Sequence, residues 1–291
     1  MVTAGGPAEA ESEAATPKVF RENWPAKVPA AGLAKGMALP LEQFMASYAD
    51  EIAVQQARDV AEMSCMRRYG FTNWKTEDLG TSPPPADNAS NMPRRYGLTV
   101  LAEAKDYGYH VPDSGKESTP PPEQDVPDAE TVLQGLKGGA EAKSFKGKEL
   151  PEGGCSGEVN RKVGALDTAL VEELSGKSFE RSQQTPTVKA AMSEWAACMK
   201  TRGYNVETVW DASDLVATNG FTASDKEIAV ATAEVECKEN TNLVKVWFAE
   251  ESAIQQQLIA DNKPALARAQ TRSKGTLNTA STVNSKAAQG L

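Results

Sequence analysis

The stretch Cys65-Met66-Arg67-Arg68-Tyr69-Gly70-Phe71 recurs in outline far downstream as Cys198-Met199-Lys200-Thr201-Arg202-Gly203-Tyr204. Both copies place Cys-Met before basic residues, a glycine and an aromatic residue, and both follow an apolar run with helical spacing. Glycine ends helices because it reaches the left-handed backbone conformation without a Cβ clash, and the aromatic residue behind it can fold back onto the last turn. Each copy therefore predicts a helix end beside a cysteine that can cross-link it.

The composition allows a real core but excludes some functions. The chain has 291 residues, of which 40% are hydrophobic and only 6% aromatic, so one large domain or two small ones would be built mainly on Ala, Val, Leu and Met. The net charge of -9 argues against binding to nucleic acid, which depends on clustered lysine and arginine. No run of roughly 18 apolar residues occurs, so no membrane span is predicted.

The four cysteines each stand alone, without a C-x-x-C pair, and the single histidine is His110. Zinc sites usually combine close cysteine pairs with histidines, so we predict no metal site and no cofactor. Isolated cysteines in even number are typical of disulfides in an oxidising compartment, and four allow three pairings. We prefer Cys198 with Cys237, because successive helices joined by a loop lie antiparallel, and this leaves Cys65 with Cys155. Four free thiols in a cytosolic protein are the alternative.

Apolar spacing and capping signals predict a mainly α-helical, disulfide-stapled fold with at most a small β-ribbon. The ribbon would pair residues 108–111 with residues 204–209. The expected helices cover residues 41–70, 98–107, 129–136, 159–164, 166–181, 186–201, 224 to beyond 237, and 242–270 with an interruption at Pro264.

The chain divides into three expected parts. Residues 1–38 have the composition of a disordered or extended spacer, such as follows a removed signal peptide or a lipidated cysteine. Residues 39–270 are expected to form one helical domain with a loop-rich insert at about 76–157, where proline and glycine are frequent. Residues 271–291 are expected to form a disordered, basic tail.

The basic character of the C-terminal region begins after Asp261. No Asp or Glu follows it, whereas five basic residues do, namely Lys263, Arg268, Arg272, Lys274 and Lys286. A solvated, mobile end is one interpretation, and contact with an anionic envelope polymer or partner is the other.

Short motifs link the chain to a known group of proteins. They are Leu39-Pro40-Leu41-Glu42, Arg94-Arg95-Tyr96-Gly97, Gly153-Gly154-Cys155-Ser156-Gly157-Glu158, Trp195-Ala196-Ala197-Cys198-Met199 and Glu236-Cys237-Lys238, together with the first Cys-Met stretch. With these motifs, most of the region from Leu39 to Gln270 resembles a family of actinobacterial secreted proteins and lipoproteins. The resemblance implies an extracytoplasmic location, often through a lipid anchor, and no established activity. The chain lacks the lipobox with which a lipoprotein would start. Because the composition of residues 2–18 is that of a spacer behind a removed signal, we expect that the targeting segment has been removed.

Residues suited to catalysis do not form a known pattern. His110 is a candidate base for a serine triad, but no Gly-x-Ser-x-Gly motif accompanies it. The tripeptide Asp113-Ser114-Gly115 matches part of an aspartic-protease signature without the second copy that shares the proton. Adjacent carboxylates such as Glu172-Glu173 and Glu250-Glu251 point about 100° apart on a helix, which does not aim both at one substrate. We therefore predict no catalytic residues.

Aromatic residues are the candidates for ligand binding. We select Trp195, Trp210, Trp247 and Tyr109, with packing in the core as the alternative role for the tryptophans. The leading hypothesis is an extracytoplasmic, non-enzymatic binding or interaction protein of the cell envelope, secreted or anchored at the surface, with an unknown ligand or partner. The alternatives are an envelope hydrolase using Asp and Glu carboxylates, and an accessory subunit of a transporter or export system.

Overall fold

The computed structural model describes residues 16–21, 24–26, 28–80, 90–112, 126–216, 218 and 222–290. The predicted mainly α-helical class is confirmed, because helices dominate and the described residues form just two small antiparallel sheets. The helices are η1 (Pro40–Phe44), α1 (Tyr48–Arg68), α2 (Leu101–Tyr107), α3 (Ala129–Gln134), α4 (Gly154–Lys162), α5 (Ala169–Gln183), α6 (Pro186–Thr201), α7 (Val209–Asp214), α8 (Asp225–Thr241) and α9 (Leu243–Ala288). The paired strands are β1 (Leu136–Lys137) with β2 (Ala140–Glu141), and β3 (Ser144–Phe145) with β4 (Lys148–Glu149).

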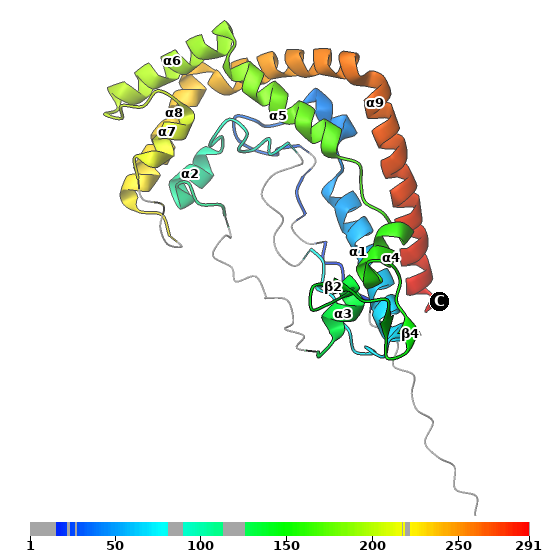
Figure 1. Ribbon diagram of the computed structural model, residues 1–291. Coiled ribbons are helices and arrows are strands. Elements are labelled where there is room, and N and C mark those ends of the chain that lie inside the picture. The colour runs from blue at the N-terminus through cyan, green and yellow to red at the C-terminus, as the bar shows by residue number, and fades with distance from the viewer. Residues whose placement is uncertain are drawn as a thin grey trace, which may run out of the picture.

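The long helix α9 bends sharply in its middle. The other helices lie with one or the other of its two halves (Figure 1). Pro264 lies in the helix near this bend. A proline has no N–H to donate to the helix, and its ring clashes with the preceding turn, so it bends the helix that contains it. The first half lies with α2, α6, α7 and α8, which we call the first arm. The second half lies with α1, α3, α4 and both sheets, which we call the second arm, and α5 runs beneath the first half (Figure 1).

The expected disorder of residues 271–291 is wrong for most of that segment, because α9 continues to Ala288. Its second half packs on α1 through Leu277, Ala280 and Val283, which contact Val54 and Ala57. These three apolar positions recur every third residue among serine, threonine and asparagine, and burial against α1 is what makes so polar a segment helical.

Helix α1 runs parallel to the second half of α9. The side chain of Gln270 donates to the carbonyl of Gln43 in η1, just before α1, at 3.0 Å, and further along α9 the side chain of Asn284 donates to the carbonyl of Ala53 in α1, also at 3.0 Å. The helix expected over residues 41–70 is divided in two, because the side chain of Ser47 accepts from the backbone N–H of Asp50 and starts α1 anew.

The segment expected to be a spacer and the expected ribbon both differ from the prediction. Within residues 28–38, Ala34 is fully buried in the first-arm core, and the N–H of Leu33 donates to the carbonyl of Thr99. Residues 108–111 and 204–209 form no strands. Instead, the chain turns back at the end of α6, where the N–H of Tyr204 donates a hydrogen bond to the carbonyl of Met199. Near the start of the described chain, two residues after Pro17, Val19 forms an isolated parallel β-bridge with Leu79.

Both predicted disulfides are present, Cys65–Cys155 joining α1 to α4 and Cys198–Cys237 joining α6 to α8. Cys65 and Cys198 each open one copy of the repeated stretch, and the two copies end α1 and α6 in the same way. Gly70 and Gly203 have φ angles of 95° and 90°, and the N–H groups of Phe71 and Tyr204 donate to the carbonyls of Met66 and Met199. The prediction of two cross-linked helix ends is confirmed.

Candidate functional site

Four aromatic rings form a continuous cluster from the core of the first arm to its surface. Tyr96 and Trp247 are fully buried, with ring centroids 5.0 Å apart. Phe179 stacks on Trp247 at 5.6 Å with an interplanar angle of 9°, and Trp210 meets both rings edge to face at 6.1 and 6.4 Å. The side chain of Trp210 keeps 39% of its surface exposed, so the cluster ends in an accessible indole.

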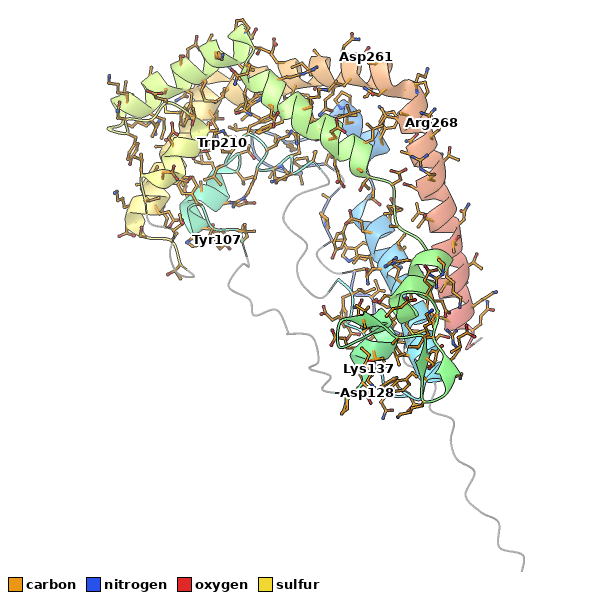
Figure 2. All side chains as sticks on the ribbon, viewed as in Figure 1. Tyr107, Asp128, Lys137, Trp210, Asp261 and Arg268 are labelled. Atoms are coloured by element: carbon orange, nitrogen blue, oxygen red, sulfur yellow. A yellow bond between two sulfur atoms is a disulfide. The ribbon has the colours of Figure 1, made fainter. Side chains whose placement is uncertain are left out.

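The exposure of Trp210 follows from how α7 is placed. The carboxylate of Asp211 accepts from the N–H of Thr208, which begins this short helix. Val209 and Ala212 on either side are buried in the core and fix the helix against the arm. Trp210 lies about 100° around the helix from Val209, away from Ala212, and so reaches the boundary with solvent (Figure 2).

Polar contacts hold the buried end of the cluster. The indole N–H of Trp247 donates to the hydroxyl of Ser182 at 2.8 Å. The guanidinium of Arg95 lies 5.1 Å from the centroid of Phe179, in a cation–π contact. Because the inner rings are hydrogen-bonded and packed, they form a rigid support for Trp210.

The same arginine belongs to a buried polar network around Glu251. Arg95 donates to both carboxylate oxygens, through Nε at 3.0 and 3.1 Å, while the hydroxyls of Tyr96 and Ser178 donate at 2.9 and 2.8 Å. Gln255 donates to the hydroxyl of Ser178 at 2.9 Å. Burial, followed by the charge of Glu251, raises the pKa of Tyr96, which keeps its hydroxyl protonated as a donor. The network joins α5, α9 and the segment before α2, and its role is structural.

A second buried ion pair, Glu234 with Lys238, lies within α8. The hydroxyl of Tyr109 donates to Glu234 at 2.7 Å, the N–H of Leu98 donates to it at 3.2 Å, and the ammonium of Lys238 donates to the carbonyl of Leu98 at 3.0 Å. Burial lowers the pKa of Lys238, and the nearby Glu234 opposes this shift. Gly97 lies directly over the pair and leaves no room for a Cβ atom. These groups attach the segments on both sides of α2 to α8.

The histidine considered as a base lies just after α2. Its Nε2 atom is 3.5 Å from Oε2 of Glu227 and has no hydrogen-bond partner within the described chain. Arg94 donates to the carbonyls of Tyr109 and His110 at 2.8 Å each, and the N–H of Tyr109 donates to Glu227 at 2.8 Å. The contacts fasten the backbone around His110 to α8. The tripeptide at residues 113–115 lies outside the described residues.

The four aromatic candidates have different surroundings. Trp195 is fully buried and donates through its indole N–H to the carbonyl of Glu234 at 3.2 Å. Trp247 is fully buried as well, so both have the core-packing role that was the alternative, and neither indole offers surface to a ligand. Tyr109 is partly buried and engaged with Glu234, whereas Trp210 remains accessible. The structure thus brings Trp210 and Trp247 together and leaves Tyr109 and Trp195 beside Glu234.

Sequence reasoning missed the residues that support this site. Arg95 and Tyr96 were noted for resemblance alone, and Glu251 as half of an adjacent carboxylate pair. A usable signal exists: Glu251 and Gln255 are polar residues four apart in an otherwise apolar helical stripe, which indicates a buried polar contact.

The described residues contain neither a cluster of metal ligands nor a membrane-spanning helix. Within residues 16–290, apart from the gaps stated above, no three or more His, Cys, Asp or Glu side chains gather as ligands for a metal ion. No described helix has both the length and the apolar character needed to cross a bilayer. Comparison with protein-family models, curated proteins and solved structures finds no match.

Proposed function

We propose that this protein is an extracytoplasmic, non-enzymatic binding protein of the cell envelope that holds its ligand at Trp210. The observation that carries the proposal is the exposed indole of Trp210 on a support of Phe179 and Trp247. A large ring that is already fixed loses little conformational freedom on binding, which is why tryptophan dominates many binding sites.

The location is supported by the cysteines. All four are paired, and disulfides form and persist in oxidising compartments outside the cytoplasm. The resemblance to actinobacterial secreted proteins and lipoproteins agrees with this location. Whether the protein is released or attached to the surface through a lipid anchor belongs to the same proposal.

The hydrolase alternative receives less support from the buried carboxylates. A catalytic pair needs two carboxyl groups that face one substrate. Glu234 and Glu251 are each occupied by several donors from their own protein, and Glu227 accepts from the N–H of Tyr109. No observation specifically favours the transporter-subunit alternative.

The test compares Trp210→Ala with Tyr107→Ala in the full-length, oxidised protein. Tyr107 is a matched control, because it is 42% exposed and also belongs to the first arm (Figure 2). Polysaccharide, lipid and protein fractions of cell envelope are immobilised separately, and the retention of each variant is measured. We expect one fraction to bind the wild type and the Tyr107 variant equally, and the Trp210 variant about tenfold more weakly or worse.

Two results contradict the proposal. Equal binding of the Trp210 variant and the wild type to every fraction shows that the indole is not the binding element. Degradation of a fraction by the wild type, with loss of that activity in the Glu227→Gln variant, favours the hydrolase instead.

A further inference from the structure

A positively charged surface runs from the bend of α9 along the second half of the helix. Its five residues, all exposed, are Lys263, Arg268, Arg272, Lys274 and Lys286, and we call them the basic surface. Figure 2 shows Arg268 at the outer side of the bend. No acidic residue follows Asp261, so with a net charge of -9 overall and +5 in this part, the preceding chain carries -9 - 5 = -14. The molecule therefore has one cationic end on an otherwise anionic chain.

The fold makes little use of these five charges. Arg272 pairs with Asp167 on the surface, whereas the other four have no acidic partner within salt-bridge distance among the described residues. The helix is held to α1 by its apolar positions, among them Leu277 and Ala280, and not by these charges. A cation in the last turn stabilises a helix through the helix dipole, which accounts for Lys286 and not for the other four.

The arrangement of the cations around the helix distinguishes between kinds of partner. Successive helical residues turn by about 100°, so Arg268, Arg272 and Lys286 lie within about 40° of each other, and Lys274 points about 120–160° away from them. The exposed positions between these directions include the polar residues Thr271, Asn278 and Thr282. No large apolar side chain is exposed in this sector of the helix, where Pro264 and Ala267 are the apolar residues. A flat bilayer touches one side of a helix and favours apolar residues there. A flexible chain can reach both directions at once.

We propose that the second half of α9 binds a linear polyanion of the cell envelope, a polymer that carries phosphate or carboxylate groups. Attraction to the basic surface and repulsion by the remaining charge of -14 both direct such a polymer to this end of the molecule. The inference takes the envelope location from the function proposed above but goes beyond the binding at Trp210, because the basic surface and Trp210 share no residue. Failure of one leaves the other intact.

The test uses two soluble probes, long-chain polyphosphate and polygalacturonate, with the full-length oxidised protein at several salt concentrations. In the test variant, all five residues of the basic surface are replaced by glutamine. The matched control replaces five exposed cations outside the second half of α9 by glutamine, namely Lys177, Arg181, Lys189, Lys200 and Lys245, and changes the net charge equally. Far-UV circular dichroism confirms that both variants fold.

We expect the wild type to bind at least one probe, with an affinity that falls steeply as salt is added. The variant of the basic surface should bind about tenfold more weakly or worse and show a smaller salt dependence, whereas the matched control keeps most of the affinity. Three outcomes overturn the inference: no binding of the wild type to either probe, equal loss in both variants, or binding to vesicles of phosphatidylglycerol but to neither polymer.

Discussion

Arg95 and Glu251 are separated by 156 residues in the chain, yet the guanidinium Nε lies 3.0 and 3.1 Å from the two carboxylate oxygens. The side chain of Glu251 is fully buried and that of Arg95 is 11% exposed. Removing one charge of such a pair leaves the other without compensation in a region of low dielectric constant.

We expect Glu251→Gln to lower the free energy of unfolding by about 3–5 kcal/mol. The control is Glu236→Gln, which removes a partner of Arg202 in an ion pair whose side chains are about one-third exposed, and should lower the unfolding free energy by less than about 1 kcal/mol. Urea denaturation of both variants measures the difference. Equal losses would show that the buried pair makes no special contribution.

The pH dependence of stability should depend on Asp59, a buried residue of α1. Burial raises the pKa of this carboxyl to about 7; a hydrogen bond from Gln55 opposes the shift, Glu62 and Glu77 add to it, and Arg58 opposes it. Since the pKa in the folded state exceeds that of the unfolded chain, the contribution is fully present below about pH 4 and is lost as the pH rises to about 7.

Asp59→Asn should therefore remove about 2–4 kcal/mol of this decrease between pH 4 and pH 8. Denaturation midpoints measured across this range, with the exposed Asp214→Asn as control, provide the check. The assignment to Asp59 is wrong if the wild type and the Asp59 variant keep the same slope against pH.

Gly97 combines a left-handed backbone, with φ of 76°, and contact with the side chains of Glu234 and Lys238. Gly36 has a similar φ of 73°, but an added Cβ there would meet nothing within 4 Å. We expect Gly36→Ala to cost about 1–2 kcal/mol through backbone strain alone. Gly97→Ala should cost clearly more, because it also displaces the buried ion pair, and thermal denaturation of the two variants separates these effects. Equal melting temperatures would contradict the close approach.

Deletion of residues 271–291 tests whether the end of α9 belongs to the fold. Loss of Leu277, Ala280 and Val283 uncovers Val54 and Ala57 on α1, and should lower the unfolding free energy by about 3 kcal/mol or more. Deletion of residues 289–291 alone should have little effect, since α9 ends at Ala288. Calorimetry on both truncations gives the comparison. A fully stable protein lacking residues 271–291 would show that the tail does not contribute.

Local signals explain which features could be predicted. The helix ends after Met66 and Met199 depend on one glycine and one aromatic residue each, all close in sequence, so their conformation was predictable. The disulfide between Cys198 and Cys237 was predictable because two helices close in sequence fold back on each other, although the short helix α7, which was not expected from the sequence, lies between them. By contrast, the helical state of residues 271–288 depends on an apolar face of α1 more than 200 residues earlier in the chain, which no local pattern reveals.

The candidate site could be predicted in part. Trp210 is one of the aromatic candidates that the sequence offers, but its exposure and the burial of Trp195 and Trp247 are decided by tertiary packing. The contact between Arg95 and Glu251 joins distant segments, and nothing in either neighbourhood specifies the partner. The expected break at Pro264 became a bend, because packing on both sides of the proline keeps the helix continuous.

The disulfide between Cys65 and Cys155 closes a loop with a sequence separation of 90 residues, and that between Cys198 and Cys237 closes one of 39. A protease that cuts the chain once inside either loop does not release a fragment, since the bond still joins the two pieces. Such a nicked molecule migrates as a single species until a reductant is added. Cleavage between residues 156 and 197 has the opposite result, because no disulfide spans that region, and only packing would hold the two halves together.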